Sequence, residues 1–236
     1  MSSKGENKRA KSRSMPKQMP VSRKEFYWTI RLAPGPHNKA TSMPLGLVLR
    51  NFAQVASNLK EVKKILNSGY VKVNGIVRKS HQFPVGLFDV ISIDAQKLYY
   101  RVILDKKERL FLKQIEKDSN EKVVKVNAKR MTKKGVQLTT NDGRNYFNVR
   151  ANVGDSLRIS LPEGKVLEVI ELKKGSVACV IKGANCSKIV VVEEVIEGTS
   201  RRKKLVKFTI GGKTFETVVD NIFLIGKDKK NLEDVA

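Results

Sequence analysis

Turn-forming residues divide most of this sequence into segments that are long enough only for short strands. Asn74-Gly75 separates residues 71–73 from residues 76–77, and Asn141-Asp142-Gly143 follows an apolar, strand-like run in the same way. Asn and Gly tolerate the positive φ of a type I′ turn, so each pattern predicts a β-hairpin. A hairpin of this size is at best marginally stable alone, so each must rest on another layer. From about Leu98 onward, short strands at regular spacing predict a barrel or sandwich.

Residues 45–67 show helical spacing instead. Apolar residues recur there every three or four positions, and Asn58 with Glu61 matches a capping box at the start of a second helix. Gly69 is a plausible end of that helix. One face of the helix is apolar and needs cover, so we expect the hairpin at 71–77 to pack on it and residues 83–93 to close the unit as a strand. The opposite face carries three lysines, Lys60, Lys63 and Lys64.

The charge of the chain points to a polyanionic partner. There are 47 Lys and Arg against 23 Asp and Glu, a net charge of +24, and such an excess destabilises a compact state through self-repulsion. Nucleic acid is the leading partner, because binding phosphates releases counterions. An anionic membrane surface is the alternative, but it calls for a basic amphipathic helix with a free apolar face. The apolar face of the helix after Asn58 is committed to the core.

The first 42 residues divide into two parts by composition. Residues 1–24 contain eight basic residues, one acid and no periodicity, which predicts a disordered basic arm that orders against phosphates. Residues 25–42 contain the adjacent aromatics Phe26, Tyr27 and Trp28. We expect this segment to pack on the next domain, and base stacking is the alternative role for these rings.

Residues suited to catalysis, metal binding or disulfide formation are scarce. The two cysteines, Cys179 and Cys186, and the two histidines, His37 and His81, form no metal-ligand pattern and no catalytic relay. We therefore expect no cofactor, no metal and no enzymatic activity. Residues 1–24 lack the apolar stretch of a signal peptide, and no run is long enough to span a membrane, so a cytoplasmic location is expected.

Several quoted segments resemble known RNA-binding families. The stretch EVKKILNSGYVKVNGIVR resembles the S-four RNA-binding domain, and GPH (35–37), MPLGLVLRN (43–51), FPVGLFDVISI (83–93) and NDGR (141–144) follow one another as in the S-four-e family of archaeal and eukaryotic small-subunit ribosomal proteins. Residues 173–195 resemble a KOW motif of SH3-like barrels. Val190 stands where that motif usually has a Gly, so we expect the barrel to be kept and the loop at 185–189 to have altered geometry.

The resemblance implies an α+β, mostly β fold in several parts. These are a disordered basic arm (1–24), an N-terminal segment packed on the next domain (25–42), an S-four-like RNA-binding domain (43–97), a central β domain (98–170), a KOW-type SH3-like barrel (171–226) and a tail (227–236). It also implies a structural constituent of the small ribosomal subunit, present as one copy beside other ribosomal proteins, with no small-molecule substrate. The alternatives are a regulatory or transcription-associated RNA-binding protein and, less favoured, an RNA-modifying enzyme, which would need a further catalytic domain.

The candidate RNA-binding residues are mostly basic side chains spread over these parts. In the S-four-like unit they are Arg50, Asn51, Lys60, Lys63, Lys64, Lys72, Asn74, Arg78 and Lys79, where the helix and the hairpin would form one basic surface. In the barrel they are Lys173, Lys174, Lys182 and Lys188. In the first 42 residues they are Lys8, Arg9, Lys11, Arg13, Arg23, Lys24, His37 and Lys39.

Overall fold

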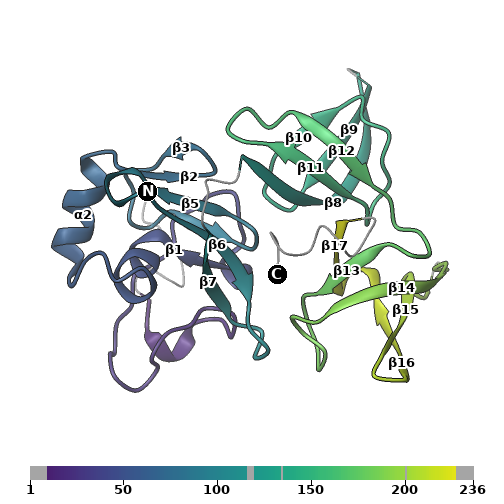
Figure 1. Cartoon of the computed structure of the whole chain (residues 1–236), viewed down its shortest axis with the longest axis horizontal. Helices are drawn as coiled ribbons and strands as arrows, with labels where there is room; N and C mark the ends of the chain where they lie inside the picture. The colour runs from purple at the N-terminus through teal and green to yellow at the C-terminus, as the bar shows by residue number, and fades with distance from the viewer. Residues whose placement is uncertain (1–9, 116–119, 134, 200, 227–236) are drawn as a thin grey trace, which may run out of the picture.

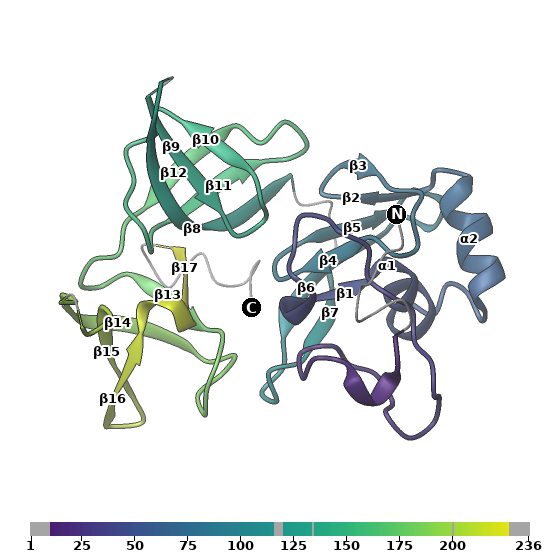
Figure 2. The same ribbon diagram turned by 180° about the vertical axis from the view of Figure 1, so that it is seen from behind.

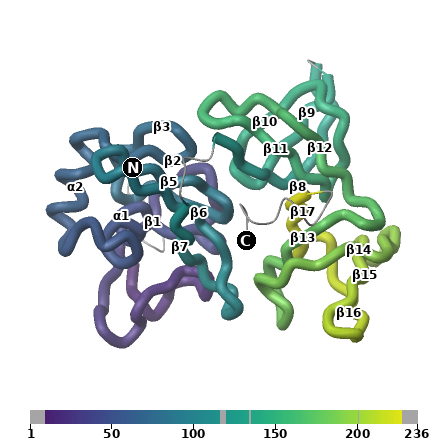
Figure 3. The backbone as a smooth tube through the Cα atoms, in the orientation of Figure 1, coloured from purple at the N-terminus to yellow at the C-terminus, as the bar shows by residue number. Residues whose placement is uncertain are grey.

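The chain folds into three β units, which a computed structural model describes for residues 10–115, 120–133, 135–199 and 201–226. The first unit forms one half of the molecule, and the second and third units are stacked on each other in the other half (Figures 1 and 3). Viewed from behind, helix α2 (Leu59–Asn67) lies at the outer edge of the first unit, far from the other two units (Figure 2).

The first unit is built on a five-stranded antiparallel sheet in the order β3-β2-β5-β6-β7, with a small two-stranded sheet, β1-β4, beside it. Its strands are β1 (Ser42–Pro44), β2 (Val71–Val73), β3 (Ile76–Val77), β4 (Pro84–Gly86), β5 (Val90–Ile93), β6 (Leu98–Leu104) and β7 (Leu110–Ile115). Its helical segments are η1 (Ser12–Ser14), η2 (Lys39–Thr41), α1 (Leu45–Leu47), the π-helical turn η3 (Val48–Phe52), α2 and η4 (Asp94–Gln96).

The local signals of helix α2 and its hairpin are confirmed. The side chain of Asn58 accepts hydrogen bonds from the backbone N–H groups of Lys60 and Glu61, and the Glu61 carboxylate accepts one from the Ser57 N–H at 2.7 Å. Asn74 and Gly75 have φ values of 53° and 76°, as a type I′ turn requires. The packing is more limited than expected, because β2 buries Val71 and Val73 whereas β3 is exposed.

Two boundaries differ from the predicted ones. Residues 83–93 form two strands, β4 and β5, separated by a turn in which Phe88 has a φ of 62°. Strands β6 and β7 complete the first sheet through the pairing of β5 with β6, so this unit extends to Ile115 and does not end at residue 97. The chain reverses at η4 and Lys97, whose φ is 52°, a turn that the sequence does not distinguish from a domain boundary.

Residues 10–24 also differ from the expected disordered arm. Ala10, Met15 and Met19 are buried in the core of the first unit, and the Leu110 N–H donates a hydrogen bond to the Gln18 carbonyl. Although this stretch is basic, its apolar side chains therefore pack into the core and order it. Residues 1–9 lie outside the described part of the chain.

The second and third units are antiparallel five-stranded sheets. The second has a small apolar core of its own, whereas the core centred on the third also takes in Val123 and Ile170 of the second unit and Phe88 of the first. The second has the order β10-β9-β8-β11-β12, with β8 (Glu121–Thr132), β9 (Gly135–Thr140), β10 (Asn145–Phe147), β11 (Ser156–Ser160) and β12 (Val166–Ile170). The third has the order β16-β15-β14-β13-β17, with β13 (Val177–Val180), β14 (Ile189–Ile196), β15 (Leu205–Ile210), β16 (Lys213–Val218), η5 (Val219–Asn221) and β17 (Ile222–Gly226).

Val190 fits this third sheet without the conflict expected from the missing glycine. It lies in extended backbone within β14, pairs with Ala178 of β13 and is buried in the core. The positive φ values nearby belong to Gly183 and Ser187. A β-branched residue suits a strand position, so Val190 itself adopts ordinary extended backbone, and altered geometry of the loop at 185–189 stays a prediction. Among the described residues, no helix is long and apolar enough to cross a membrane.

Candidate nucleic-acid interface

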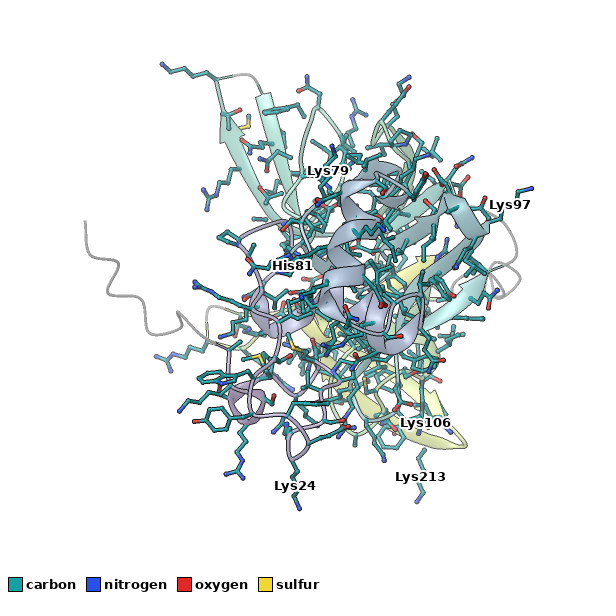
Figure 4. The ribbon with its side chains drawn as sticks, turned by 90° about the vertical axis from the view of Figure 1, so that its left-hand side faces the viewer. Lys24, Lys79, His81, Lys97, Lys106 and Lys213 are labelled. Carbon is teal, nitrogen blue, oxygen red and sulfur yellow. The ribbon has the colours of Figure 1, made fainter. Side chains whose placement is uncertain are left out.

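The outward side of helix α2 carries three exposed lysines close together in sequence. Lys60, Lys63 and Lys64 are exposed, and none of them forms an ion pair with a carboxylate of the described residues. Figure 4 looks onto this side, where Lys79 and His81 lie beside the helix. Burial and the neighbouring Lys63 charge both lower the pKa of His81. This face therefore concentrates positive charge that no carboxylate of the described residues neutralises.

Other candidates on this unit are partly engaged by their neighbours. Lys72 pairs with Asp94 at 2.7 Å, and the Arg78 guanidinium lies over the Phe83 ring at 4.5 Å from its centroid. The Nε of Arg50 donates to the Asn51 side-chain oxygen at 2.9 Å. Surface pairs of this kind are weak, so a phosphate can compete with Asp94 for Lys72.

Asn74 and His37 are turned inward, which corrects their assignment as RNA contacts. The Asn74 side chain donates to Asp89 at 2.9 Å and accepts from the Val90 N–H at 3.0 Å. His37 is buried, and its Nε2 lies 2.9 Å from the other oxygen of Asp89. Both residues contact the carboxylate of Asp89; His37 is buried away from the surface, and the half-buried Asn74 uses its amide in these two hydrogen bonds.

Asp89 belongs to a buried ion-pair network that joins the first and second units, and sequence reasoning missed it. Its carboxylate lies 2.7 Å from the Nζ of Lys122 on β8, and the same Nζ lies 3.4 Å from Asp142. The Lys122 side chain is 1% exposed and that of Asp89 is fully buried. The backbones of the two units also approach closely near this network, because a Cβ added to Gly75 of the first unit would lie 2.9 Å from Pro162 of the second unit.

The pKa values in this network follow from burial opposed by pairing. Burial alone would raise the pKa of Asp89. The charges and hydrogen bonds of Lys122 and His37 lower this pKa by more than burial raises it, so the pKa lies well below its usual range. The pKa of Asp142 is lowered in the same way, mainly by Lys122 against burial. Burial lowers the pKa of Lys122, and the two carboxylates more than restore it, so it ends raised.

The third unit is joined to both other units by hydrogen bonds that the sequence analysis did not predict. The Nζ of Lys125 on β8 donates to the backbone carbonyls of Val219 and Ile222, both at 2.7 Å. The Ser187 hydroxyl donates to the Leu104 carbonyl at 2.7 Å, and the Glu108 carboxylate accepts from the Gly183 N–H at 2.6 Å. The three units are therefore held in one arrangement.

The predicted lysines of the third unit lie on its surface but do not form one cluster of unpaired charge. Lys173 pairs with Glu171, and Lys188 donates to the Asn185 side chain at 2.9 Å. Lys174 and Lys182 are exposed. Carboxylates accompany many of the other lysines of this unit, as in the pair of Lys207 with Glu194 at 3.1 Å.

In the N-terminal segment, the candidate cations are exposed and so are the aromatic rings. Lys11, Arg13, Arg23, Lys24 and Lys39 all reach solvent; Lys8 and Arg9 lie outside the described residues. Phe26, Tyr27 and Trp28 are 58%, 59% and 48% exposed, so the expectation that these rings pack on the next domain is wrong. The backbone of this segment is ordered through pairing with residues 10–12, which leaves the rings outside.

The described residues contain no group of three His, Cys, Asp or Glu side chains that could hold a metal ion. Cys179 and Cys186 are both buried free thiols, and burial raises the pKa of Cys179 to about 12.

A helix with an exposed basic face, beside a five-stranded sheet and joined to two further β units, defines a modular, mostly β protein with a concentrated positive surface. Comparison with known proteins makes this specific. The family model described as Ribosomal family S4e matches residues 96–166. Small ribosomal subunit protein eS4 of Methanothermobacter thermautotrophicus is 40% identical over 97% of this chain and 95% of its own length. The protein of the same name from Nanoarchaeum equitans is 37% identical over 90% of this chain and 92% of its own length.

The crystal structure of the 30S ribosomal protein S4e from Thermoplasma acidophilum is similar as well. It has a TM-score of 0.70 and 30% identity, and the match covers 80% of this chain and 97% of that one. The chain belongs to the S4e family of ribosomal proteins, named eS4 among these relatives. This confirms the predicted family, the mostly β fold and the prediction that the protein is not an enzyme.

Proposed function

We propose that this protein is a structural constituent of the small ribosomal subunit that holds folded ribosomal RNA against its basic surfaces. The relatives that match nearly the whole chain carry the name of a small-subunit protein. The observation that carries the mode of binding is the stripe of Lys60, Lys63 and Lys64, which are exposed and have no carboxylate partner within the described residues.

The proposed mechanism is distributed clamping of phosphates. The lysines of α2 supply mobile point charges, and Arg50 and Lys79 extend the surface beside them. Phosphate contacts fix position without reading a base sequence, so the protein responds to the shape of a folded RNA junction. The chain would act in the cytoplasm as one copy per particle, next to other ribosomal proteins and without a small-molecule substrate.

The test compares two triple substitutions with the same change in charge. Replacing Lys60, Lys63 and Lys64 by Gln should weaken binding to small-subunit ribosomal RNA and reduce the slope of log affinity against log salt by about 2 to 3. The control replaces Lys203, Lys204 and Lys207, whose amines already lie 2.7, 2.8 and 3.1 Å from carboxylates. The control should change the slope less, and equal slopes in both variants would place the RNA surface elsewhere.

Assembly is tested separately by sedimentation of a native lysate at moderate and high salt. The chain should travel with the small subunit and resist the salt wash. If it stays at the top of the gradient, or follows RNA polymerase, the protein is a regulatory RNA-binding protein that has kept the fold.

A further inference from the structure

The exposed aromatic segment at residues 26–28 is held in a fixed conformation. The Ser12 N–H donates to the Tyr27 carbonyl and the Thr29 N–H donates to the Ala10 carbonyl, both at 2.9 Å. The Tyr27 and Trp28 rings meet edge to face with centroids 4.7 Å apart, and the Lys11 amine lies 5.3 Å from the Tyr27 centroid. Large rings that stay exposed on an ordered backbone are the usual sign of a binding surface.

Trp28 also lines a pocket of about 530 Å³ between this segment and the S-four-like unit. The size is in the range of small-ligand pockets. Its other side chains combine apolar surface with cations, and they include Arg31, Arg50, Leu59, His81 and Gln82. The two terminal nitrogens of Arg50 have no partner among the described residues, because only its Nε is used, by Asn51.

The pocket is continuous with the basic stripe on α2. Leu59 is the first residue of that helix, and His81 is close enough to Lys63 for the lysine charge to lower its pKa. Among the residues that the structure describes, no acidic side chain lines the pocket. An aromatic face next to arginines, bordered by lysines, is complementary to an unpaired nucleotide, whose base stacks while its phosphates meet the cations.

We propose that this pocket captures the base of an unpaired nucleotide, stacked on Trp28, with the adjoining phosphates against Arg31 and Arg50. The proposal deepens the proposed function, on which it rests: the lysines of α2 hold the folded part of the RNA, and the pocket takes a single-stranded part next to it. A paired base would be excluded, because its faces are covered by its neighbours in the duplex.

Trp28 is the only tryptophan of the chain, so fluorescence excited selectively in tryptophan, and not in the five tyrosines, reports on this pocket in the full-length protein. An oligouridylate of about ten nucleotides, within the usual size of a single-strand site, should quench the emission in a saturable way. An RNA duplex of the same length should bind, as followed by the anisotropy of a labelled strand, and leave the emission unchanged. Saturable binding of the oligouridylate without quenching would overturn the proposal.

The variant Trp28→Leu should lower the affinity for the labelled oligouridylate roughly 5- to 150-fold, the range found for loss of one stacked base, and leave duplex affinity unchanged. Trp28→Phe should keep most of the affinity for the oligouridylate, because phenylalanine still offers an aromatic face. Phe147→Leu is the matched control, because Phe147 is an exposed ring on β10, 46% accessible, in the second unit. Unchanged affinity of Trp28→Leu for the oligouridylate overturns the capture of a base and leaves the proposed function standing. A protein that binds neither RNA overturns both.

Discussion

Lys122 of the second unit forms a buried ion pair with Asp89 of the first. Its amine is buried between the carboxylates of Asp89 and Asp142, on segments that lie far apart in the sequence. A buried ion pair adds little net stability compared with a well-packed apolar pair, but removal of one partner leaves the other charge buried and unpaired.

The substitution Lys122→Met should therefore lower the free energy of unfolding by about 3 to 5 kcal/mol, measured by urea titration. The matched control is Lys165→Met, because Lys165 pairs with Glu163 at 2.6 Å while both side chains are more than half exposed. That surface pair should contribute no more than about 1 kcal/mol. Equal losses in the two variants would mean that the junction does not depend on the Lys122 charge.

The same network should make stability fall in acid. The pKa values of Asp89 and Asp142 are lowered in the folded protein, whereas an unfolded aspartate titrates near about 3.9. As the pH falls, these carboxylates are therefore protonated in the unfolded chain at a higher pH than in the folded protein. The stabilisation that is present above about pH 4 is lost as the pH falls toward the pKa values of the folded protein. Urea midpoints between about pH 6 and pH 3 measure this loss.

Asp89→Asn should show a smaller drop over that range, and Asp105→Asn, in the exposed turn after β6, should show the full drop. A full drop in Asp89→Asn would assign the acid sensitivity to other carboxylates.

At the residue scale, sequence reasoning found the exposed cations and missed the buried ones. Nothing local distinguishes Lys122 and Lys125 from other lysines of an alternating strand, although both are buried. Their partners, Asp142 and the carbonyl of Val219, come from other elements that only the fold brings near. His37 and Asn74 were misassigned for the same reason, because Asp89 lies 52 and 15 residues away from them.

Among the elements, those set by local chemistry were predictable. Asn74 and Gly75 form a turn because both accept positive φ, whereas in the turn at residues 141–143 only Gly143 has a positive φ. Helix α2 begins after Asn58 because the Asn58 side chain caps it. The boundary at residue 97 was wrong, since whether β6 joins the preceding sheet depends on pairing partners. The burial of Met15 and Met19 could not be predicted either, because these side chains pack against core residues that are distant in the sequence.

Helix α2 gives a prediction at the scale of one element. Asn58→Ala removes the side-chain acceptor for two backbone N–H groups, so the free energy of unfolding should fall by about 1 kcal/mol, within a range of about 0.5 to 2. Asn67→Ala, at the exposed last position of the same helix, is the control and should change the free energy less. The result also bears on RNA binding, because the cap holds the first turn that carries Lys60. No loss of stability in Asn58→Ala would show that packing alone fixes this end.

For the whole molecule, the net charge of +24 sets the response to salt. Repulsion among exposed cations opposes the folded state and is screened as ionic strength rises, while the buried Lys122 network is screened much less. The melting temperature should therefore rise between about 0.05 M and 0.5 M sodium chloride. The variant with Lys60, Lys63 and Lys64 replaced by Gln should show a smaller rise. A melting temperature that falls with salt would mean that the surface ion pairs outweigh the repulsion.

The junctions built by Lys122, Lys125 and Glu108 have a consequence for selectivity. Because the three units cannot swing apart without stripping partners from buried or bonded groups, the spacing between their outer faces is settled before any RNA arrives. Little freedom is then left to be lost on binding. Under the proposed function, the protein would act as a rigid template: RNA whose phosphates are spaced to match its basic faces would bind, and misfolded RNA with other spacings would bind less well, without contacts that read its base sequence.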